Sequence, residues 1–218
     1  MWFAKLAHNF ANVPFIKRQL TENRLFVRLY FNWRYRNADP YGLDSSEYER
    51  EKLDRVARAL EFKPRFESAL EIGCGEGKLT ARLAPKTDRI LAVDISDLAV
   101  RRARESLRGM AHVIIERRDI FSDAPLEMYE LVVCSEVLFY FEPDQLPGVV
   151  EKVKERTRPG GYCLLVHARA LADDTAGIEL KKFGARTIHE MFINDERFTT
   201  VTDDVQPLYR ITIVQRRP

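Results

Sequence analysis

A glycine-rich turn follows a short apolar run in the segment "ALEIGCGEGKLT". Three glycines alternate there, Gly73, Gly75 and Gly77, and Glu71 stands two residues before the first. Such a turn between a strand and a helix presents backbone N–H groups and the positive end of the helix dipole to a ligand. Lys78 stands where a dinucleotide-binding turn has its third glycine, and no hydroxyl follows that lysine as in a P-loop. The turn and Glu71 therefore favour a cationic ligand group over a phosphate.

Polar residues follow three later apolar runs. Asp94 comes at the end of "RILAVDI", Asp119 and Ile120 follow "HVIIER", and Ser135 and Glu136 lie in "LVVCSEV". Because parallel strands end at one edge of a sheet, we expect these residues to gather beside the glycine turn. Asp94 can accept hydrogen bonds from both hydroxyls of a ribose, as also happens in dinucleotide-binding folds. Asp94 alone therefore does not distinguish the two kinds of nucleotide site.

The order and spacing of these residues over positions 65–215 resemble the motifs of the class I S-adenosyl-methionine-dependent methyltransferases. The resemblance implies S-adenosyl-methionine as the cofactor, with Glu71 near its ammonium group. It also implies that Asp119 accepts from the adenine amino group, while the next backbone amide donates to the ring. The cofactor-binding residues implied in this way are Glu71, Gly73, Cys74, Gly75, Asp94, Ile95, Asp119, Ile120 and Ser135.

The elements that must position these residues alternate between strands and helices. Nearly continuous apolar runs predict strands buried on both faces of a parallel sheet, at 68–73, 89–95, 112–117, 131–137 and 162–168. The turn "RPGG" is expected before the fifth strand. The family resemblance implies an α/β, Rossmann-like class I methyltransferase fold. That fold has a mostly parallel seven-stranded sheet with a C-terminal antiparallel hairpin, and we expect an N-terminal helical extension here.

Two regions are predicted along the chain. Residues 1–45 form an aromatic and basic extension that we expect to be part of the pocket cover, and residues 46–218 form the methyltransferase domain. The segment "YFNWRYRNADPYGLDSSEYEREK" is similar to the nodulation N-methyltransferase-like branch of the family. That resemblance implies methylation of an amine on an amino sugar or a sugar-bearing metabolite. Methylation of a small-molecule hydroxyl is the close alternative.

Methyl transfer from a sulfonium is a direct displacement, so alignment of the reacting atoms supplies much of the rate. Glu136 is the first candidate for a base that accepts the proton of the acceptor, or for a group that orients an amine. His167 is the second candidate, because the unperturbed pKa of histidine suits proton transfer near neutral pH. Tyr41 and Tyr140 are expected to wall the substrate pocket, since aromatic faces suit cationic groups. His189 is a further candidate for substrate binding.

Composition narrows the remaining function classes. The 218 residues carry a net charge of only +2, and 45% of them are hydrophobic, as in ordinary globular proteins. Two alternatives from other classes stay open, an NAD-dependent oxidoreductase and a non-catalytic nucleic-acid-binding module using the basic N-terminal segment. No cluster has metal-ligand spacing, so no metal site is predicted.

We expect a small-molecule substrate, no nucleic-acid partner, no membrane association and a cytoplasmic location. No apolar run is long enough to span a bilayer, and no signal-peptide core is evident at the N-terminus. The three isolated cysteines are expected to be buried and reduced. The oligomeric state is left open by the sequence.

Overall fold

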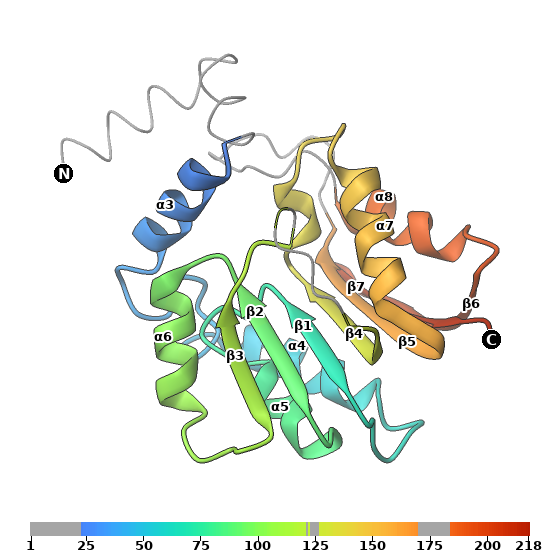
Figure 1. Ribbon diagram of the computed structural model, residues 1–218, viewed down its shortest axis with the longest axis horizontal. Coiled ribbons are helices and arrows are strands. Elements are labelled where there is room, and N and C mark those ends of the chain that lie inside the picture. Colours follow the sequence, from blue (N-terminus) through green and yellow to red (C-terminus); the bar gives the residue numbers. More distant parts are fainter. Residues whose placement is uncertain (1–22, 121, 123–126, 170–183) are drawn as a thin grey trace.

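One sheet of seven strands organises the chain, and the computed structural model describes residues 23–120, 122, 127–169 and 184–218 (Figure 1). The strands are β1 (Ala69–Ile72), β2 (Ile90–Asp94), β3 (Val113–Arg117), β4 (Tyr129–Ser135), β5 (Thr157–Ala168), β6 (Phe198–Val205) and β7 (Tyr209–Arg216). Their order across the sheet is β3–β2–β1–β4–β5–β7–β6. Neighbours from β3 to β5 run parallel, whereas β7 pairs antiparallel with both β5 and β6. The predicted sheet and its C-terminal antiparallel hairpin are therefore confirmed.

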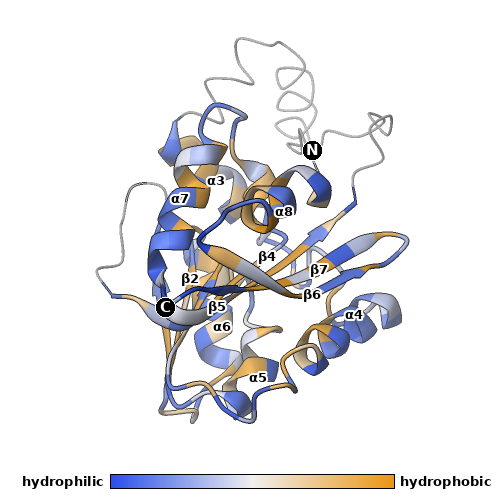
Figure 2. Ribbon diagram, turned by 90° about the vertical axis from the view of Figure 1, so that its right-hand side faces the viewer, coloured by the Kyte–Doolittle hydropathy of each residue, from blue (hydrophilic) through white to orange (hydrophobic). Residues whose placement is uncertain are grey.

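Helices cover both faces of this sheet, as Figure 2 shows. The helices are α3 (Arg24–Arg34), α4 (Glu47–Arg58), α5 (Thr80–Leu83), α6 (Asp97–Ser106), α7 (Leu146–Arg156) and α8 (Ala185–Ile193), with short 3-10 turns at Ala84–Lys86 and Leu138–Tyr140. α7 and α8 pack on one face, and α4, α5 and α6 pack on the other. Because both faces are covered, the central strands β1 and β4 are almost fully buried, which explains their continuous apolar sequence.

Local sequence signals account for the helix starts. Ser46 caps α4 by accepting from the backbone N–H of Glu49, and Ser96 caps α6 by accepting from Ala99 N–H. The predicted turn "RPGG" is corrected by the structure, which includes residues 158–161 in β5. The pairing of β4 with β5 shifts register at this point, so the segment forms a bulge inside the strand.

The N-terminal extension is described from residue 23 onward. Its helix α3 lies beside the start of α6, as Figure 1 also shows. Asn32 accepts from the Ser96 hydroxyl at 2.8 Å and donates to Asp97 at 3.0 Å. Arg28 donates to the same Asp97 carboxylate at 2.8 Å. These contacts fix α3 beside the carboxyl ends of the first strands.

Candidate functional site

A cavity of about 390 Å³ lies at the carboxyl ends of β1, β2 and β4, within the size range of ligand pockets. The glycine turn, Asp94, Asp119 and Glu136 all contribute to its lining, as predicted from the strand order. The extension contributes Arg24, Val27, Phe31, Tyr35 and Tyr41. The predicted residues that line the cavity are Tyr41, Glu71, Gly73, Cys74, Gly75, Asp94, Ile95, Asp119, Ile120, Ser135, Glu136 and Tyr140.

The glycine turn has a backbone that only glycine adopts easily. Gly73, Gly75 and Gly77 all have positive φ angles, of 76°, 54° and 81°. A Cβ at Gly73 would lie 2.8 Å from Val137, and one at Gly77 would lie 2.9 Å from Leu107, which follows the last residue of α6. Gly77 thus permits the close packing against a helix that a dinucleotide-binding turn assigns to its third glycine.

Two buried carboxyl groups flank the turn. Thr80 donates to Glu71 at 2.6 Å, and burial, with a smaller contribution from Asp94, raises the pKa of Glu71 to about 8. Burial also raises the pKa of Asp94, although backbone N–H groups oppose that rise. Its two oxygens accept from Gly75 N–H at 2.9 Å and from Ser96 N–H at 2.8 Å. No cation contributes to either pKa among the described residues, so the pair fits a ligand that brings positive charge.

Asp119 also lines the cavity and is paired with Arg24, a residue that was not predicted from the sequence. Arg24 of α3 donates from Nε and from a terminal nitrogen to the two Asp119 oxygens, at 2.5 and 2.6 Å. The Asp119 side chain is only 5% exposed. A ligand amino group at Asp119 would therefore have to share this carboxylate with the guanidinium or displace it.

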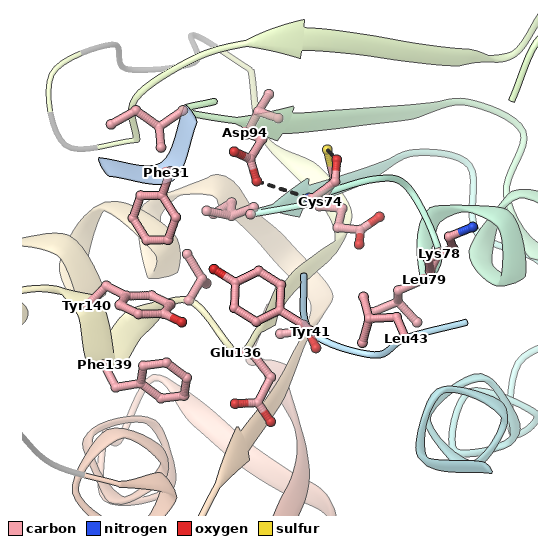
Figure 3. A pocket seen from close by; sticks show the side chains of 18 of the residues that line it. Phe31, Tyr41, Leu43, Cys74, Lys78, Leu79, Asp94, Glu136, Phe139 and Tyr140 are labelled. Atoms are coloured by element: carbon pink, nitrogen blue, oxygen red, sulfur yellow. Dashed lines mark hydrogen bonds between the residues drawn. The ribbon is translucent and has the colours of Figure 1, made fainter. Parts of the chain in front are cut away.

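Glu136 lies just beyond the end of β4 and has a φ angle of 52°, a strained conformation that is common at functional sites. Its carboxylate accepts from Ala168 N–H at 3.2 Å and from Lys52 at 3.4 Å. Figure 3 shows the Tyr41 ring in the middle of the cavity, between Asp94 and Glu136, with Phe31 and Tyr140 beside it. In this view the Tyr41 ring separates the Asp94 side of the cavity from the Glu136 side.

The two histidines are not part of this cavity, which corrects both predictions about them. Both side chains are fully buried and neither lines the pocket. The Leu138 N–H donates to His167 Nε2 at 3.3 Å, so the ring proton of His167 lies on Nδ1, which is 3.0 Å from His189 Nε2. His189 Nδ1 in turn lies 2.7 Å from the Thr212 hydroxyl, which donates to Asp203 at 2.8 Å.

This chain of hydrogen bonds needs both rings neutral. Burial and the nearby Arg210 lower the pKa of His189 to about 3, which agrees with the neutral form. Because the Nε2 lone pair of His167 faces the Leu138 amide, it is not directed at an acceptor molecule. The histidines instead support the backbone that follows Glu136. Of the two candidate bases predicted from the sequence, Glu136 is the one that lines the cavity.

Comparison with known proteins decides the family. The sequence model of the family described as "Nodulation protein S (NodS)" matches residues 30–202, which is most of the chain. The chain belongs to the NodS family. It resembles the crystal structure of the N-methyltransferase NodS from Bradyrhizobium japonicum WM9 in complex with S-adenosyl-L-homocysteine, with a TM-score of 0.78 and 25% identity. That match covers 88% of this chain and 98% of the other.

The curated relatives include several NodS proteins. Nodulation protein S of Sinorhizobium fredii is 30% identical over 104 residues, 48% of each chain. Nodulation protein S of Azorhizobium caulinodans is 27% identical over 154 residues, 70% of this chain and 72% of its own. The match to the first relative thus spans about half of that protein's length. The predicted class I S-adenosyl-methionine-dependent methyltransferase fold and the nodulation N-methyltransferase-like branch are confirmed. Within the described segments, no helix has the length and apolar character needed to cross a membrane.

The Glu71 pKa predicts that cofactor binding releases a proton. At pH 7 the free protein holds Glu71 protonated, whereas an ammonium group bound there favours the carboxylate. Calorimetry of S-adenosyl-homocysteine binding at pH 7, in buffers with different ionisation enthalpies, should show about one proton released per site, and affinity should rise towards pH 8. Glu71→Gln should abolish the release, and wild-type binding heats that are independent of the buffer would contradict this role.

The same pKa has a consequence for stability. Because the folded-state pKa lies above the unfolded value of 4.5, the unfolded chain binds fewer protons between these limits. The stabilising effect of the neutral group is complete below pH 4.5 and is lost as the pH rises through about 8. In the absence of cofactor, Glu71→Gln should therefore gain more melting temperature relative to wild type at pH 8 than at pH 5.

Gly73→Ala should weaken cofactor binding and lower stability by about 2–3 kcal/mol, since it combines a strained backbone with a collision. The added methyl would lie 2.8 Å from Val137, next to Glu136. Gly109→Ala is the matched control, because Gly109 has a φ of 98° but nothing within 4 Å of the added Cβ. Thermal melts and calorimetry of both variants isolate the collision. Equal losses in the two variants would show that backbone strain alone accounts for the effect.

Proposed function

We propose that this protein transfers the methyl group of S-adenosyl-methionine to an amine of a small-molecule acceptor, an amino sugar or sugar-bearing metabolite. When bound, the cofactor supplies a methyl group on a sulfonium, which a nucleophile displaces directly. Family membership and the N-methyltransferase among its structural relatives support this reaction. In the proposal, Glu71, Asp94 and Asp119 hold the cofactor, and Glu136 faces the acceptor.

The main support for methylation of an amine is the charge of the side chains around Glu136. Lys52 lies between two carboxylates, 2.6 Å from Glu49 and 3.4 Å from Glu136, so these three side chains together carry one net negative charge. The attacking nitrogen becomes positive as its bond to the methyl carbon forms, and a fixed negative charge stabilises that change. Both Glu136 oxygens already accept a donor, which suits orienting an amine better than removing a hydroxyl proton. Amine methylation is therefore preferred to hydroxyl methylation.

The two alternatives from other classes find less support in the contacts. A dinucleotide would bring its pyrophosphate close to Glu71, a buried acid beside the glycine turn. A nucleic-acid surface would need the basic residues of the extension to face solvent. In the described part of the extension, Arg24 pairs with Asp119, the partly exposed Arg28 pairs with Asp97, and the Arg34 guanidinium lies over the Tyr41 ring at 5.0 Å, so three of its four arginines have partners within the protein.

Two measurements test the proposed function. Calorimetry should detect binding of S-adenosyl-methionine but not of NAD. Isotope-labelled methyl should then pass to glucosamine but not to N-acetylglucosamine, which keeps the ring hydroxyls and lacks the free amine. Equal labelling of both sugars would favour hydroxyl methylation, and binding of NAD alone would overturn the proposal.

A further inference from the structure

Lys52 of α4 is a buried cation in the wall of the cavity. Its side chain is 8% exposed, although a charged residue on a surface helix is ordinarily solvated. Its ammonium forms an ion pair with Glu49 at 2.6 Å and donates to Glu136 at 3.4 Å. The rings of Tyr48 and Tyr209 lie 6.0 and 5.9 Å from the Lys52 nitrogen. Lys52 is the last residue of the segment "YFNWRYRNADPYGLDSSEYEREK", but it was not among the predicted site residues.

The Lys52 side chain stays charged despite its burial. Burial acts to lower its pKa, but Glu136 and Glu49 more than offset that effect, so the pKa is raised. An ammonium group has three N–H donors. Among the described residues its polar contacts are with Glu49 and Glu136, so one donor is left on a residue that lines the cavity. The contact with Glu136 is long, which leaves that carboxylate able to bind a second donor.

We propose that Lys52 is a specificity-determining residue, which donates to an oxygen beside the acceptor nitrogen while Glu136 contacts the nitrogen itself. This inference rests on the proposed function and narrows its acceptor to an amine with a hydroxyl on the adjacent carbon. The Lys52 nitrogen and the nearer Glu136 oxygen lie 3.4 Å apart, so one ligand can meet both through neighbouring substituents. Tyr48, which also lines the cavity, offers a ring face to the carbon skeleton.

Hydrogen bonding to Lys52 should distinguish an amine with an adjacent hydroxyl from a simple amine. A buried ammonium with an unused donor loses free energy unless a ligand oxygen replaces water. An amino alcohol supplies that oxygen together with the N–H group for Glu136. An amine without the hydroxyl leaves the Lys52 donor unpaired once water has left the pocket. Such an amine should therefore bind more weakly.

The test compares methyl glucosaminide with its 3-deoxy analogue, which lacks the hydroxyl beside the amine. In the presence of S-adenosyl-homocysteine, wild-type protein should bind the hydroxylated probe about tenfold more tightly or better, as measured by calorimetry. In Lys52→Met the ratio of the two affinities should fall to near one. The same ratio should appear in kcat/KM when labelled methyl is transferred from S-adenosyl-methionine.

Lys154→Met is the matched control. Lys154 is also 8% exposed, pairs with Asp195 at 2.7 Å and lies over the Phe192 ring at 5.3 Å, but it does not line the cavity. This variant should keep the wild-type preference for the hydroxyl, even if it loses stability. It therefore separates loss of a buried lysine from loss of this particular donor.

Two results would overturn the inference. One is a wild-type affinity ratio near one, which needs no variant to fold. The other is an unchanged ratio in Lys52→Met. Because the ratio is measured by binding, it stands apart from catalysis. If the protein prefers the hydroxylated probe but transfers no methyl group, the proposed function is refuted and Lys52 remains a ligand-binding residue. If methyl transfer occurs without any preference for the hydroxyl, only the role of Lys52 is refuted.

Discussion

Asp94→Asn should lower the affinity for S-adenosyl-homocysteine by about a hundredfold or more, since two hydrogen bonds to a charged acceptor are each worth roughly 1.5–3 kcal/mol. In the proposed site, the Asp94 carboxylate receives the ribose hydroxyls. It also supports the glycine turn, because its oxygens accept from Gly75 N–H and Ser96 N–H at 2.9 and 2.8 Å. Asparagine has one acceptor oxygen, so its amide NH₂ would face one of these backbone donors.

The loss at Asp94 should therefore have two parts. Thermal melting without ligand reports the damage to the turn, and calorimetry reports the weakened cofactor site. Asp88→Asn is the control, because Asp88 precedes the amino end of the same strand, is exposed and pairs with Arg65. It should leave binding unchanged. If Asp94→Asn bound S-adenosyl-homocysteine as tightly as wild type, the ribose assignment would be wrong.

The cavity residues that follow the parallel strands were predictable, because the order of the strands along the chain determines which residues meet at one edge of the sheet. Asp94, Asp119 and Glu136 each follow a buried apolar run, and a sheet with parallel strands brings their carboxyl ends together. Backbone conformation also left a signal at Gly73 and Gly75, since only glycine tolerates both the positive φ and the close approach of a neighbour.

Contacts between segments that are distant along the chain could not be predicted from the sequence in this way. Arg24 and Tyr35 reach the cavity because α3 packs against α6, and no local pattern specifies which surface an amphipathic helix will cover. Lys52 lies next to the apolar stripe of α4, where a lysine is ordinarily solvated. Its burial is tolerable because Glu49, one turn earlier on α4, and Glu136, just beyond the end of β4, both compensate its charge. Its place beside Glu136 could be found only from the fold.

The predictions that His167 and His189 belong to the site were wrong for a related reason. His167 ends a strand that borders the site, and its pKa in water suits proton transfer, so the sequence favoured a catalytic role. Which way its ring faces depends on α8, which brings His189 within hydrogen-bonding distance. Chemistry-bearing residues at a strand end are thus predictable as candidates, but the packing on each face of the sheet decides which of them reach the ligand.

Glu136→Gln should reduce turnover by about 10²–10³-fold, the usual cost of removing one group that stabilises charge developing in the transition state. Cofactor affinity should be retained, because Asp94, Asp119 and the glycine turn are untouched. The measurement is kcat for labelled methyl transfer to glucosamine, with calorimetry of S-adenosyl-homocysteine alongside. Glu130→Gln is the control: Glu130 lies at the opposite end of β4, is buried and pairs with Lys63 at 2.9 Å, but does not line the cavity. It should lose stability and keep kcat.

The loss of turnover in Glu136→Gln, called the deficit below, should vary with pH in different ways for two possible roles of the carboxylate. If Glu136 accepts the proton of an ammonium acceptor, the deficit should shrink as the pH rises and the amine arrives already deprotonated. If Glu136 instead stabilises the charge that develops on nitrogen during attack, the deficit should stay constant across that range. Its two existing donors, Lys52 and the Ala168 N–H, favour the constant deficit. Wild-type turnover in Glu136→Gln at every pH would exclude both roles and move the search for the acceptor-binding group to Tyr41 and Tyr140.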